Sequence, residues 1–259
     1  MPELPEIESL RRQLSRVLKG ENIGKAEVYD RKIGRLPDLQ GRTVAAVRRE
    51  GKALWVDLGG DLALRLHMRM SGRLLWRAGG GARPAHTRFC LFFRTGELLC
   101  VDPRRFATLE ARRTEEDTAA APDALQVKDA AWLQKAAQGR RLPVKTFLMD
   151  QRILTGIGNI YACEILYDAA VDPHRAARSV SRREWRRITE AMARVLKTAV
   201  KCRGTSISDW RDLHGEKGEF QNRLQVYDRS GQTCRRCGGT VQRTVLGGRG
   251  TYFCPSCQR

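Results

Sequence analysis

The sequence contains no long apolar run. None approaches the roughly 20 residues that a helix needs to cross a bilayer, and no apolar segment follows the acidic first turn, as a secretory signal peptide would require. No internal repeat is apparent. These absences predict a soluble, cytoplasmic protein without a membrane partner. Its 259 residues, 41% of them hydrophobic, are enough for one large domain or two ordinary ones.

Acidic residues are scarce beside basic ones. The chain has 29 Asp and Glu against 48 Lys and Arg, which gives a net charge of +19. A field of one sign indicates a polyanionic partner, with nucleic acid the first candidate and an anionic membrane surface the second. The basic residues are scattered through folded-looking segments instead of forming a terminal tail. This distribution favours a shaped binding face over a disordered arm.

Cysteine is sparse outside one cluster. Four of the eight stand singly in apolar or mixed segments and are typical of reduced core thiols: Cys90, Cys100, Cys163 and Cys202. The other four form two CxxC pairs separated by sixteen residues: Cys234, Cys237, Cys254 and Cys257. In an intracellular protein this spacing indicates metal more than disulfides. Four thiolates close a tetrahedral site, so the sequence predicts one structural Zn²⁺ that stabilises a zinc ribbon.

The first residues place an amine next to carboxylates. Removal of Met1 would leave Pro2 with a free secondary amine, and an α-amino group has a pKa of roughly 8 against about 10.4 for lysine. Such an amine attacks sugar or carbonyl carbons and forms a Schiff base. Glu3 and Glu6 lie within reach of it in the sequence. The alternative is an ordinary helix start, because Pro and acids suit the first turn of a helix.

A glycine-rich stretch in the second half is suited to contact phosphate. Gly156 and Gly158 let the backbone approach closely, and a helix opening at Asn159 presents free N–H groups. Asn159 adds a side-chain donor and Lys145 a cation. The alternatives are a plain helix cap for Asn159 and a solvated surface charge for Lys145.

Four stretches together resemble one known family. They are MPELPEIE at the start, KTFLMDQ from Lys145, GIGNIYACE from Gly156 and GRGTYFC from Gly248. They are similar to the formamidopyrimidine-DNA glycosylase and endonuclease VIII family of base-excision repair enzymes. The endonuclease VIII branch typically has Gly at the position of Leu4, so the opening favours the first branch. Matching motifs run from Pro2 to Cys257.

This resemblance implies a bifunctional DNA glycosylase and AP lyase for oxidised purines such as 8-oxoguanine and formamidopyrimidines. Pro2 would attack the sugar carbon and displace the base, Glu3 would manage proton transfers, and Glu6 would position the reactive end. The resulting Schiff base then permits elimination of the 3′ phosphate and afterwards the 5′ phosphate. Lys52, which opens a strand, would hold a phosphate near the lesion; its alternative is a solvent-facing strand lysine.

The resemblance also assigns DNA contacts in two loops. In HMRMSG, His67 would contact a phosphate, although a satisfied core histidine is the alternative. In DPRRF, Arg104 and Phe106 would join Met70 in filling the gap left by a flipped base. The sequence departs from the family at two positions, Arg69 and Ala107, where the family usually has glycine.

Further contacts are implied in the second half. Arg249 would bind a phosphate beside the lesion and is therefore both a catalytic and a DNA-binding candidate. Lys145 and Asn159 are further DNA-binding candidates. Residues 209–218 match the position of a loop that closes over the flipped purine, although a disordered surface loop fits the composition equally. An arginine cluster from Arg175 to Arg187 is either a DNA contact or a solvated helix face.

The fold class predicted is α+β and multidomain. An N-terminal helix over residues 3–18 and a two-sheet β-sandwich form a catalytic domain (1–115), and a linker (116–128) follows. A helical helix–two-turn–helix domain with the lid loop (129–218) and a zinc-ribbon finger (219–259) complete the chain. Strand patterns are expected at Ile23–Tyr29, Thr43–Arg49, Ala53–Leu58, Leu62–Met68, Arg88–Phe93 and Leu98–Val101. Helices are expected at Asp129–Gln138, Val144–Asp150, Asn159–Asp168 and Ser181–Lys201.

The protein is expected to be a monomer that binds damaged double-stranded DNA. Its expected location is the bacterial cytoplasm. Two alternatives remain open. One is an endonuclease VIII-like glycosylase for oxidised pyrimidines, which Leu4 and the length of the lid segment disfavour. The other is a non-catalytic zinc-ribbon nucleic-acid binder, which would have no need of Pro2, Glu3 and Lys52.

Overall fold

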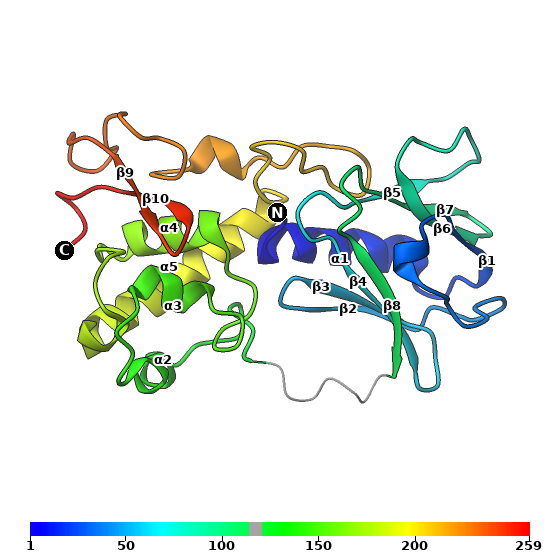
Figure 1. The fold of residues 1–259 in the computed structure, drawn as a ribbon, viewed down its shortest axis with the longest axis horizontal. Coiled ribbons are helices and arrows are strands. Elements are labelled where there is room, and N and C mark those ends of the chain that lie inside the picture. The colour runs from blue at the N-terminus through cyan, green and yellow to red at the C-terminus, as the bar shows by residue number, and fades with distance from the viewer. Residues whose placement is uncertain (114–120) are drawn as a thin grey trace. The chain divides into compact units, whose positions relative to one another are not determined.

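The computed structural model describes residues 1–113 and 121–259, which form two compact units (Figure 1). The first unit comprises Met1–Ala119 and Cys202–Gln221, and the second comprises Ala120–Lys201 and Asn222–Arg259. Part of the predicted linker, 116–128, lies outside the described residues. The four-part division made from the sequence remains a prediction about domains. Among the described residues, none of the helices combines the length and apolar character that crossing a bilayer requires.

Helix α1 (Leu4–Leu18) confirms the helix expected over 3–18. Its apolar residues recur at helical spacing, and Ile7, Leu10 and Leu14 are fully buried. The helix begins with a capping box in which Glu3 and Glu6 each accept the other's backbone N–H. The acids of the first turn therefore serve the helix start, whatever further role they have.

Two four-stranded antiparallel sheets pack in the first unit. One has the order β1-β6-β7-β5 and the other β2-β3-β4-β8. Their bounds are β1 Ile23–Val28, β2 Ala46–Glu50, β3 Ala53–Asp57, β4 Leu62–His67, β5 Arg73–Arg77, β6 Thr87–Phe93, β7 Gly96–Val101 and β8 Thr108–Arg113. A short helical turn, η1 (Arg31–Ile33), follows β1. Residues of α1 and of both sheets share one hydrophobic core, which is the predicted sandwich flanked by its helix.

Strands β5 and β8 were not predicted from the sequence. Each is an edge strand, with arginine at one or both ends and few fully buried positions. Pairing with a neighbour, β7 or β4, makes them strands, because their own patterns are weak. They matter for the site: HMRMSG connects β4 to β5 and DPRRF connects β7 to β8, so both loops cross between the sheets.

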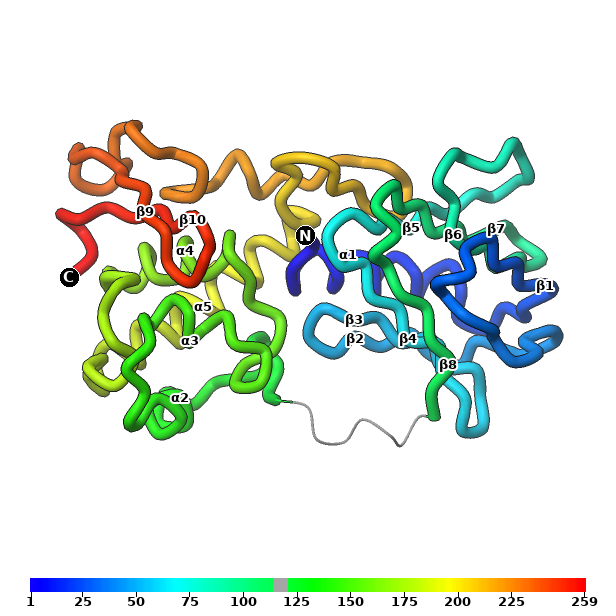
Figure 2. The backbone as a smooth tube through the Cα atoms, viewed as in Figure 1, coloured from blue at the N-terminus to red at the C-terminus, as the bar shows by residue number. Residues whose placement is uncertain are grey.

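Residues 202–221 return to the first unit, where they can be followed in Figure 2. Gln13 of α1 donates to Asp212 Oδ2 at 2.9 Å and accepts the Leu213 N–H at 3.0 Å. The Leu213 carbonyl accepts the Trp76 N–H of β5 at 2.9 Å, and the Leu213 side chain is fully buried. The predicted lid segment, 209–218, is therefore anchored by backbone bonds and core packing, unlike a disordered loop.

The second unit is helical and ends in a hairpin. Its elements are α2 Ala130–Ala137, α3 Val144–Met149, α4 Asn159–Asp168, η2 Ala177–Ser179, α5 Arg182–Lys201, β9 Gln242–Leu246 and β10 Arg249–Phe253; η3 (Phe220–Arg223) lies where the two units meet in the sequence. The predicted capping box before α5 is confirmed, since Ser181 and Glu184 each accept the other's backbone N–H. Each predicted helix is present to within one residue at either end.

Candidate active site and nucleic-acid interface

The N-terminal end of α1 is held rigidly. Pro2 is buried, and Glu3 and Glu6 are 3% and 2% exposed. Glu6 Oε2 accepts the Glu3 N–H at 2.8 Å, and Glu6 Oε1 accepts the Thr205 N–H at 2.7 Å. Gly204 has φ +83°, and a Cβ there would lie 2.4 Å from Glu6 Oε1, so only glycine fits. One carboxylate thus joins the first turn of α1 to the segment that follows α5.

The turn that carries Lys52 is tied to the same helix. Arg49 of β2 donates to Glu8 Oε2 at 3.2 Å and to the Gly51 carbonyl at 2.9 Å. Burial raises the pKa of Glu8, but hydrogen bonds from two arginines of α1 outweigh it and lower that pKa to about 2. The carboxylate is therefore ionised at neutral pH. Lys52 is only 9% exposed, so the alternative of a solvent-facing strand lysine is wrong.

The two loops between the sheets project apolar side chains into solvent. Met70 is 52% exposed and Phe106 is 48% exposed. The Arg104 guanidinium lies over the Phe106 ring, with its Cζ 5.6 Å from the ring centroid. The alternative in which Met70 and Phe106 are core residues is therefore wrong. Their exposure leaves both side chains available to a binding partner.

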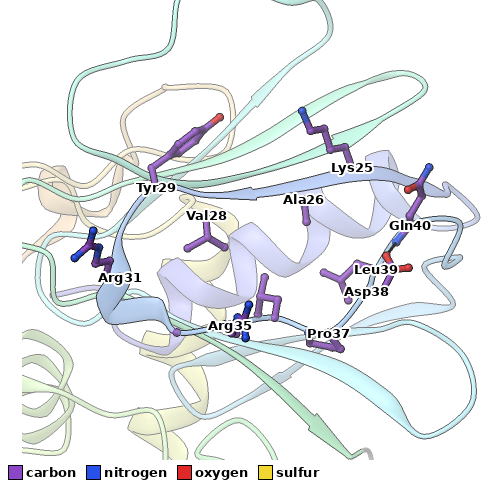
Figure 3. Close-up of a pocket in the computed structure, with 12 residues that line it drawn as sticks. Lys25, Ala26, Val28, Tyr29, Arg31, Arg35, Pro37, Asp38, Leu39 and Gln40 are labelled. Carbon is purple, nitrogen blue, oxygen red and sulfur yellow. Dashed lines mark hydrogen bonds between the residues drawn. The ribbon is translucent and has the colours of Figure 1, made fainter.

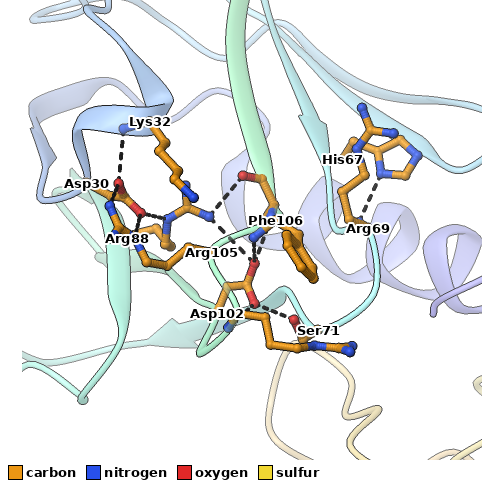
Figure 4. Close-up of polar contacts among 11 residues, drawn as sticks. Asp30, Lys32, His67, Arg69, Ser71, Arg88, Asp102, Arg105 and Phe106 are labelled. Atoms are coloured by element: carbon orange, nitrogen blue, oxygen red, sulfur yellow. Dashed lines mark hydrogen bonds and ion pairs between the residues drawn. The ribbon is translucent and has the colours of Figure 1, made fainter.

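A second buried carboxylate, Asp30, is bonded to Arg105 of the DPRRF loop (Figure 4). Asp30, at the start of η1, accepts Arg105 Nε at 2.8 Å and forms an ion pair with the buried Arg88. Arg105 has φ +60°, a left-handed conformation that these bonds to Asp30 help to hold. Sequence reasoning missed Asp30 and Arg88, for which the available signal was an aspartate placed to cap a turn. Arg105 is therefore committed to Asp30, whereas its neighbour Arg104 faces the Phe106 ring.

His67 ends β4 and is half-buried. Its Nδ1 accepts the Arg69 N–H at 2.9 Å, so the ring proton of the neutral form lies on Nε2. Burial lowers the pKa of His67 to about 4, with further lowering by the cations Arg69, Arg65 and Lys52. Arg69 has φ +53°, a left-handed conformation that glycine adopts without strain and other residues adopt rarely. His67 is thus a neutral hydrogen-bond donor at physiological pH.

We expect a pH titration to show directly that the pKa of His67 is lowered in the folded protein. The folded pKa of about 4 lies below the ordinary value of roughly 6.5, so the unfolded chain binds the proton more readily. The stability that neutral His67 confers is complete above pH 6.5 and is lost as the pH falls towards 4. NMR of the imidazole nitrogens should give a midpoint near 4 in the native protein and near 6.5 in denaturant. Equal midpoints in both states would contradict the assignment.

In the second unit, the buried Lys145 and the partly buried Asn159 form a polar cluster. Lys145 is 1% exposed, and its ammonium donates to Asn159 Oδ1 at 2.6 Å, the Gly250 carbonyl at 3.1 Å and Thr251 Oγ1 at 2.7 Å. The Asn159 amide also donates to the Gly250 carbonyl, at 2.9 Å. The alternative of a solvated surface lysine is therefore wrong. The sequence anticipated these residues but not the bonds that join α3 and α4 to the hairpin.

The hairpin presents Arg249 at its tip. β9 and β10 pair from Leu246 with Arg249, and the turn between them consists of Gly247 and Gly248, both at positive φ. Two successive left-handed residues are what a tight two-residue hairpin turn requires. Arg249 is exposed at the first position of β10, one residue before Gly250. The turn thus holds an exposed cation next to the polar cluster of Lys145 and Asn159.

The four clustered cysteines fit a zinc ion. Their Sγ atoms all lie within 4.8 Å of one another. The Cys234 and Cys257 sulfurs are 3.8 Å apart, and those of Cys237 and Cys254 are 3.5 Å apart. Tetrahedral zinc with Zn–S bonds of about 2.3 Å requires sulfurs about 3.8 Å apart. The geometry matches a closed structural Zn²⁺ site, as predicted.

Tyr167 of α4 adds a contact that the sequence did not reveal. Its buried hydroxyl lies 3.3 Å from Cys234 Sγ. Zinc-bound thiolates carry no proton, so the hydroxyl must donate. Tyr167→Phe should weaken zinc affinity by roughly tenfold, because partners of this kind fix and stabilise metal ligands. Competition with a chromophoric chelator measures this. Tyr252→Phe, which removes a hydroxyl from β10, is the matched control, and equal affinity of both variants would count against the contact.

The arginine cluster divides into bound and exposed members. Arg175 donates to the Glu184 carboxylate and to the carbonyls of Ser179 and Arg259, so it is part of the local structure. Arg187 lies 3.8 Å from the same carboxylate. The exposed members are Arg178, Arg182, Arg183 and Arg186. DNA contact by these four stays a prediction.

The first unit also has a surface hollow (Figure 3). It has a volume of about 770 Å³ and is lined by β1 and the segment that follows it, with Lys25, Tyr29 and Arg35 among its walls. None of the site residues predicted from the sequence lines it. The candidate chemistry therefore lies in the loops and helix ends described above.

Three family models match the chain. They are the formamidopyrimidine-DNA glycosylase N-terminal domain over residues 1–109, the formamidopyrimidine-DNA glycosylase H2TH domain over 120–210, and the zinc finger found in FPG and IleRS over 231–259. A two-sheet unit, a helix–two-turn–helix unit and a four-cysteine finger in one chain define a zinc-finger DNA glycosylase, an enzyme of DNA repair. The chain belongs to the formamidopyrimidine-DNA glycosylase family.

Relatives in sequence and structure agree. Formamidopyrimidine-DNA glycosylase of Moorella thermoacetica is 42% identical over 94% of each chain, and that of Desulfitobacterium hafniense is 37% identical over the full length of both. Three solved Lactococcus lactis complexes are similar. A mutant with Fapy-dG containing DNA has a TM-score of 0.92, 30% identity and complete coverage. The complex with abasic site containing DNA has a TM-score of 0.92 and 29% identity, and the match covers 99% of each chain. The complex with oxidised pyrimidine containing DNA has a TM-score of 0.90 and 29% identity, and the match covers both chains completely.

Proposed function

We propose that this protein excises oxidised purines, such as 8-oxoguanine and formamidopyrimidines, from double-stranded DNA and then cleaves the strand. The observation that carries this proposal is the N-terminal end: Pro2 is buried beside two buried acids, one of which holds the first turn of α1 in place. A Lactococcus lactis relative, 30% identical, has been solved with Fapy-dG containing DNA. The buried N-terminal end supports the Schiff-base chemistry, and the relative's complex supports a purine lesion as the substrate.

The proposed reaction starts at the Pro2 nitrogen after removal of Met1. The amine attacks C1′ of the damaged nucleotide, the N–C1′ bond forms, and the glycosidic bond breaks as the base leaves and takes up a proton. Glu3 transfers protons on the sugar as its ring opens to the iminium. Loss of a 2′ proton then expels the 3′ phosphate, and a second elimination expels the 5′ phosphate. A positioned acid–base group contributes about 100-fold to 10,000-fold.

Residues of both units are proposed to hold the DNA. Lys52, His67, Asn159 and Arg249 are proposed to contact phosphates near the lesion. His67 would do so as a neutral donor through Nε2–H, because its Nδ1 is occupied by the Arg69 N–H. The burial of Lys145 favours a supporting role, in which its ammonium orients the Asn159 amide and the Gly250 carbonyl behind Arg249.

Met70, Arg104 and Phe106 are proposed to fill the gap that a flipped base leaves. Extruding a paired base costs a few kcal/mol, and a preformed abasic site largely lacks that cost. Alanine at each position should therefore slow 8-oxoguanine excision by about tenfold or more, with a smaller effect on abasic-site cleavage. Arg104→Ala should in addition weaken discrimination among opposite bases, because its guanidinium donors can read base acceptors. Single-turnover rates on both substrates measure this.

Thermal melting serves as the control for these three variants. Both apolar side chains are half-exposed, so their removal should leave the melting temperature nearly unchanged. We call the side chains of Met70, Arg104 and Phe106 the wedge. A parallel loss of both activities together with lowered stability would contradict their assignment as the wedge.

Oxidised pyrimidines are the second candidate substrate. The Lactococcus lactis relative has also been solved with oxidised pyrimidine containing DNA, and it is 29% identical to this chain.

We further propose that the protein acts as a monomer. Its location is proposed to be the bacterial cytoplasm, because its curated relatives come from bacteria. The four-part division with a linker at 116–128 is kept as the proposed domain organisation.

Borohydride trapping tests the function. Purified protein is incubated with duplexes that carry 8-oxoguanine, an oxidised pyrimidine, an abasic site or no lesion, and covalent complexes are counted after reduction. We expect trapping on 8-oxoguanine and abasic DNA and none on undamaged DNA. Faster trapping on the pyrimidine lesion would favour the second candidate. No trapping on any duplex, with tight DNA binding, would leave a non-catalytic binder.

A further inference from the structure

Asp102 is a fully buried carboxylate that is bonded to both loops of the first unit, HMRMSG and DPRRF. It is 0% exposed and follows β7 at the start of the DPRRF loop. Its Oδ2 accepts the N–H groups of Phe106 and Ala107, each at 2.7 Å, and its Oδ1 accepts the Arg104 N–H at 3.1 Å. Two side chains of the proposed wedge thus stem from backbone that is bonded directly to this one carboxylate.

The same carboxylate reaches the other loop. Ser71 Oγ, next to Met70 in HMRMSG, donates to Asp102 Oδ1 at 2.5 Å (Figure 4). The loops also touch through Gly72, where a Cβ would lie 2.7 Å from the Met68 carbonyl oxygen and 2.8 Å from Ala107 Cβ. The methyl group of Ala107, where the family usually has glycine, is thus accommodated because position 72 has no side chain. The two loops are joined by one hydrogen bond and one close contact.

Ionisation suits the carboxylate to this position. Burial raises the pKa of Asp102, but the bonds from Ser71 and from the three loop N–H groups outweigh it, and the net shift is downward. An ionised carboxylate accepts up to about four hydrogen bonds, whereas an asparagine amide accepts only through its oxygen. Four donors from two loops therefore require aspartate.

We infer that Asp102 is a positioning residue that sets Met70, Arg104 and Phe106 as one unit, with the Ser71 hydroxyl as the link between the two loops. This inference rests on the proposed function, because it concerns the wedge. If the loops moved independently, one could retract while the other entered the DNA. Because both loops are bonded to the same carboxylate, the loop that carries Met70 enters the DNA together with the loop that carries Arg104 and Phe106. No substrate contact is assigned to Asp102 or Ser71 themselves.

Ser71→Ala is the most selective test, because it removes the link and leaves the DPRRF loop bonded. We expect about a tenfold slower single-turnover excision of 8-oxoguanine, which corresponds to about 1.4 kcal/mol. Cleavage at a preformed abasic site should change less than about twofold, because no base has to be flipped there. Ser71→Thr keeps the hydroxyl and should restore excision. A 2-aminopurine placed beside the lesion should report slower unstacking in Ser71→Ala but not in Ser71→Thr.

Thr43→Ala is the matched control. It removes a hydroxyl that donates to Asn22 Oδ1 at 2.6 Å in the same unit, outside both loops. It should leave both rates at the wild-type value. Asp102→Asn extends the series, with a larger loss of excision than Ser71→Ala, and melting temperatures separate misfolding from misplacement.

Two outcomes overturn the inference. One is wild-type excision by Ser71→Ala; the other is an equal loss of excision and abasic cleavage that Ser71→Thr does not restore. Failure of the proposed function looks different. In that case the alanine variants of Met70, Arg104 and Phe106 would also excise normally, or the wild type would show no preference for the lesion.

Discussion

Replacing Pro2 by Gly is expected to remove most base excision and most borohydride trapping while DNA binding persists. Glycine still offers an amine after Met1 is removed, but that amine is primary. Its imine can lose the N–H proton and with it the permanent positive charge that draws electrons during elimination. We expect the rate to fall by roughly 100-fold or more, as for loss of a covalent nucleophile. Trapping yield and single-turnover excision measure this.

The structure makes Pro2→Gly a clean substitution. Helix α1 begins after Pro2, and its start is held by the capping box and by the Thr205 N–H bond to Glu6, neither of which involves the Pro2 side chain. Melting temperature should therefore change little. Pro37→Gly, in an exposed segment of the same unit, controls for the general effect of exchanging proline for glycine.

Mass spectrometry must confirm Met1 removal in each sample, because a retained methionine blocks the amine. If Pro2→Gly lacking Met1 trapped as well as the wild type, Pro2 would not be the nucleophile. Loss of DNA binding together with trapping would instead point to damage at the helix start.

Cys237→Ser is expected to release zinc, unfold the finger and weaken DNA binding by about 100-fold or more. Structural zinc of this kind contributes on the order of 10–16 kcal/mol to the folding of a small finger. Three remaining thiolates cannot close the tetrahedral site. The hairpin of β9 and β10, which carries Arg249 at its turn, would lose its support.

The loss should spread beyond the finger because of Lys145. Its buried ammonium donates to the Gly250 carbonyl and to Thr251 Oγ1, both on β10. If the hairpin unfolds, Lys145 loses its bonds to Gly250 and Thr251, and a buried charge that loses hydrogen-bond partners is destabilised. Asn159 loses its Gly250 bond at the same time. One cysteine substitution should thus disturb both proposed phosphate contacts of the second unit, Asn159 and Arg249.

Cys202→Ser provides the control, since Cys202 lies outside the four-cysteine cluster. Elemental analysis should find one zinc per chain in the wild type and in Cys202→Ser, and little in Cys237→Ser. Affinity for an abasic-site duplex is measured at one fixed salt concentration, because phosphate contacts make binding strongly salt-dependent. Wild-type affinity of zinc-free protein would show that the finger is dispensable.

The sequence alone determined much of this protein. Two CxxC pairs predict zinc because thiolate spacing is set by local turns that need no distant partner. The helix at 3–18 and the capping box at Ser181 follow from short-range periodicity and short-range hydrogen bonds. The family could be predicted for the same reason, since its signatures are contiguous stretches such as GIGNIYACE and DPRRF.

Tertiary structure decided what depends on residues distant in the chain. Strands β5 and β8 exist because β7 and β4 pair with them, although their own patterns are weak. The sequence presents Lys145 as a cation for phosphate contact, with a solvated surface charge as the alternative, but only helix packing shows that it is buried against the hairpin. Asp102 and Ser71 stand 31 residues apart, so no local pattern could join them. A buried charge is stable only where the fold brings donors or opposite charges to it, and that arrangement is a property of the whole unit.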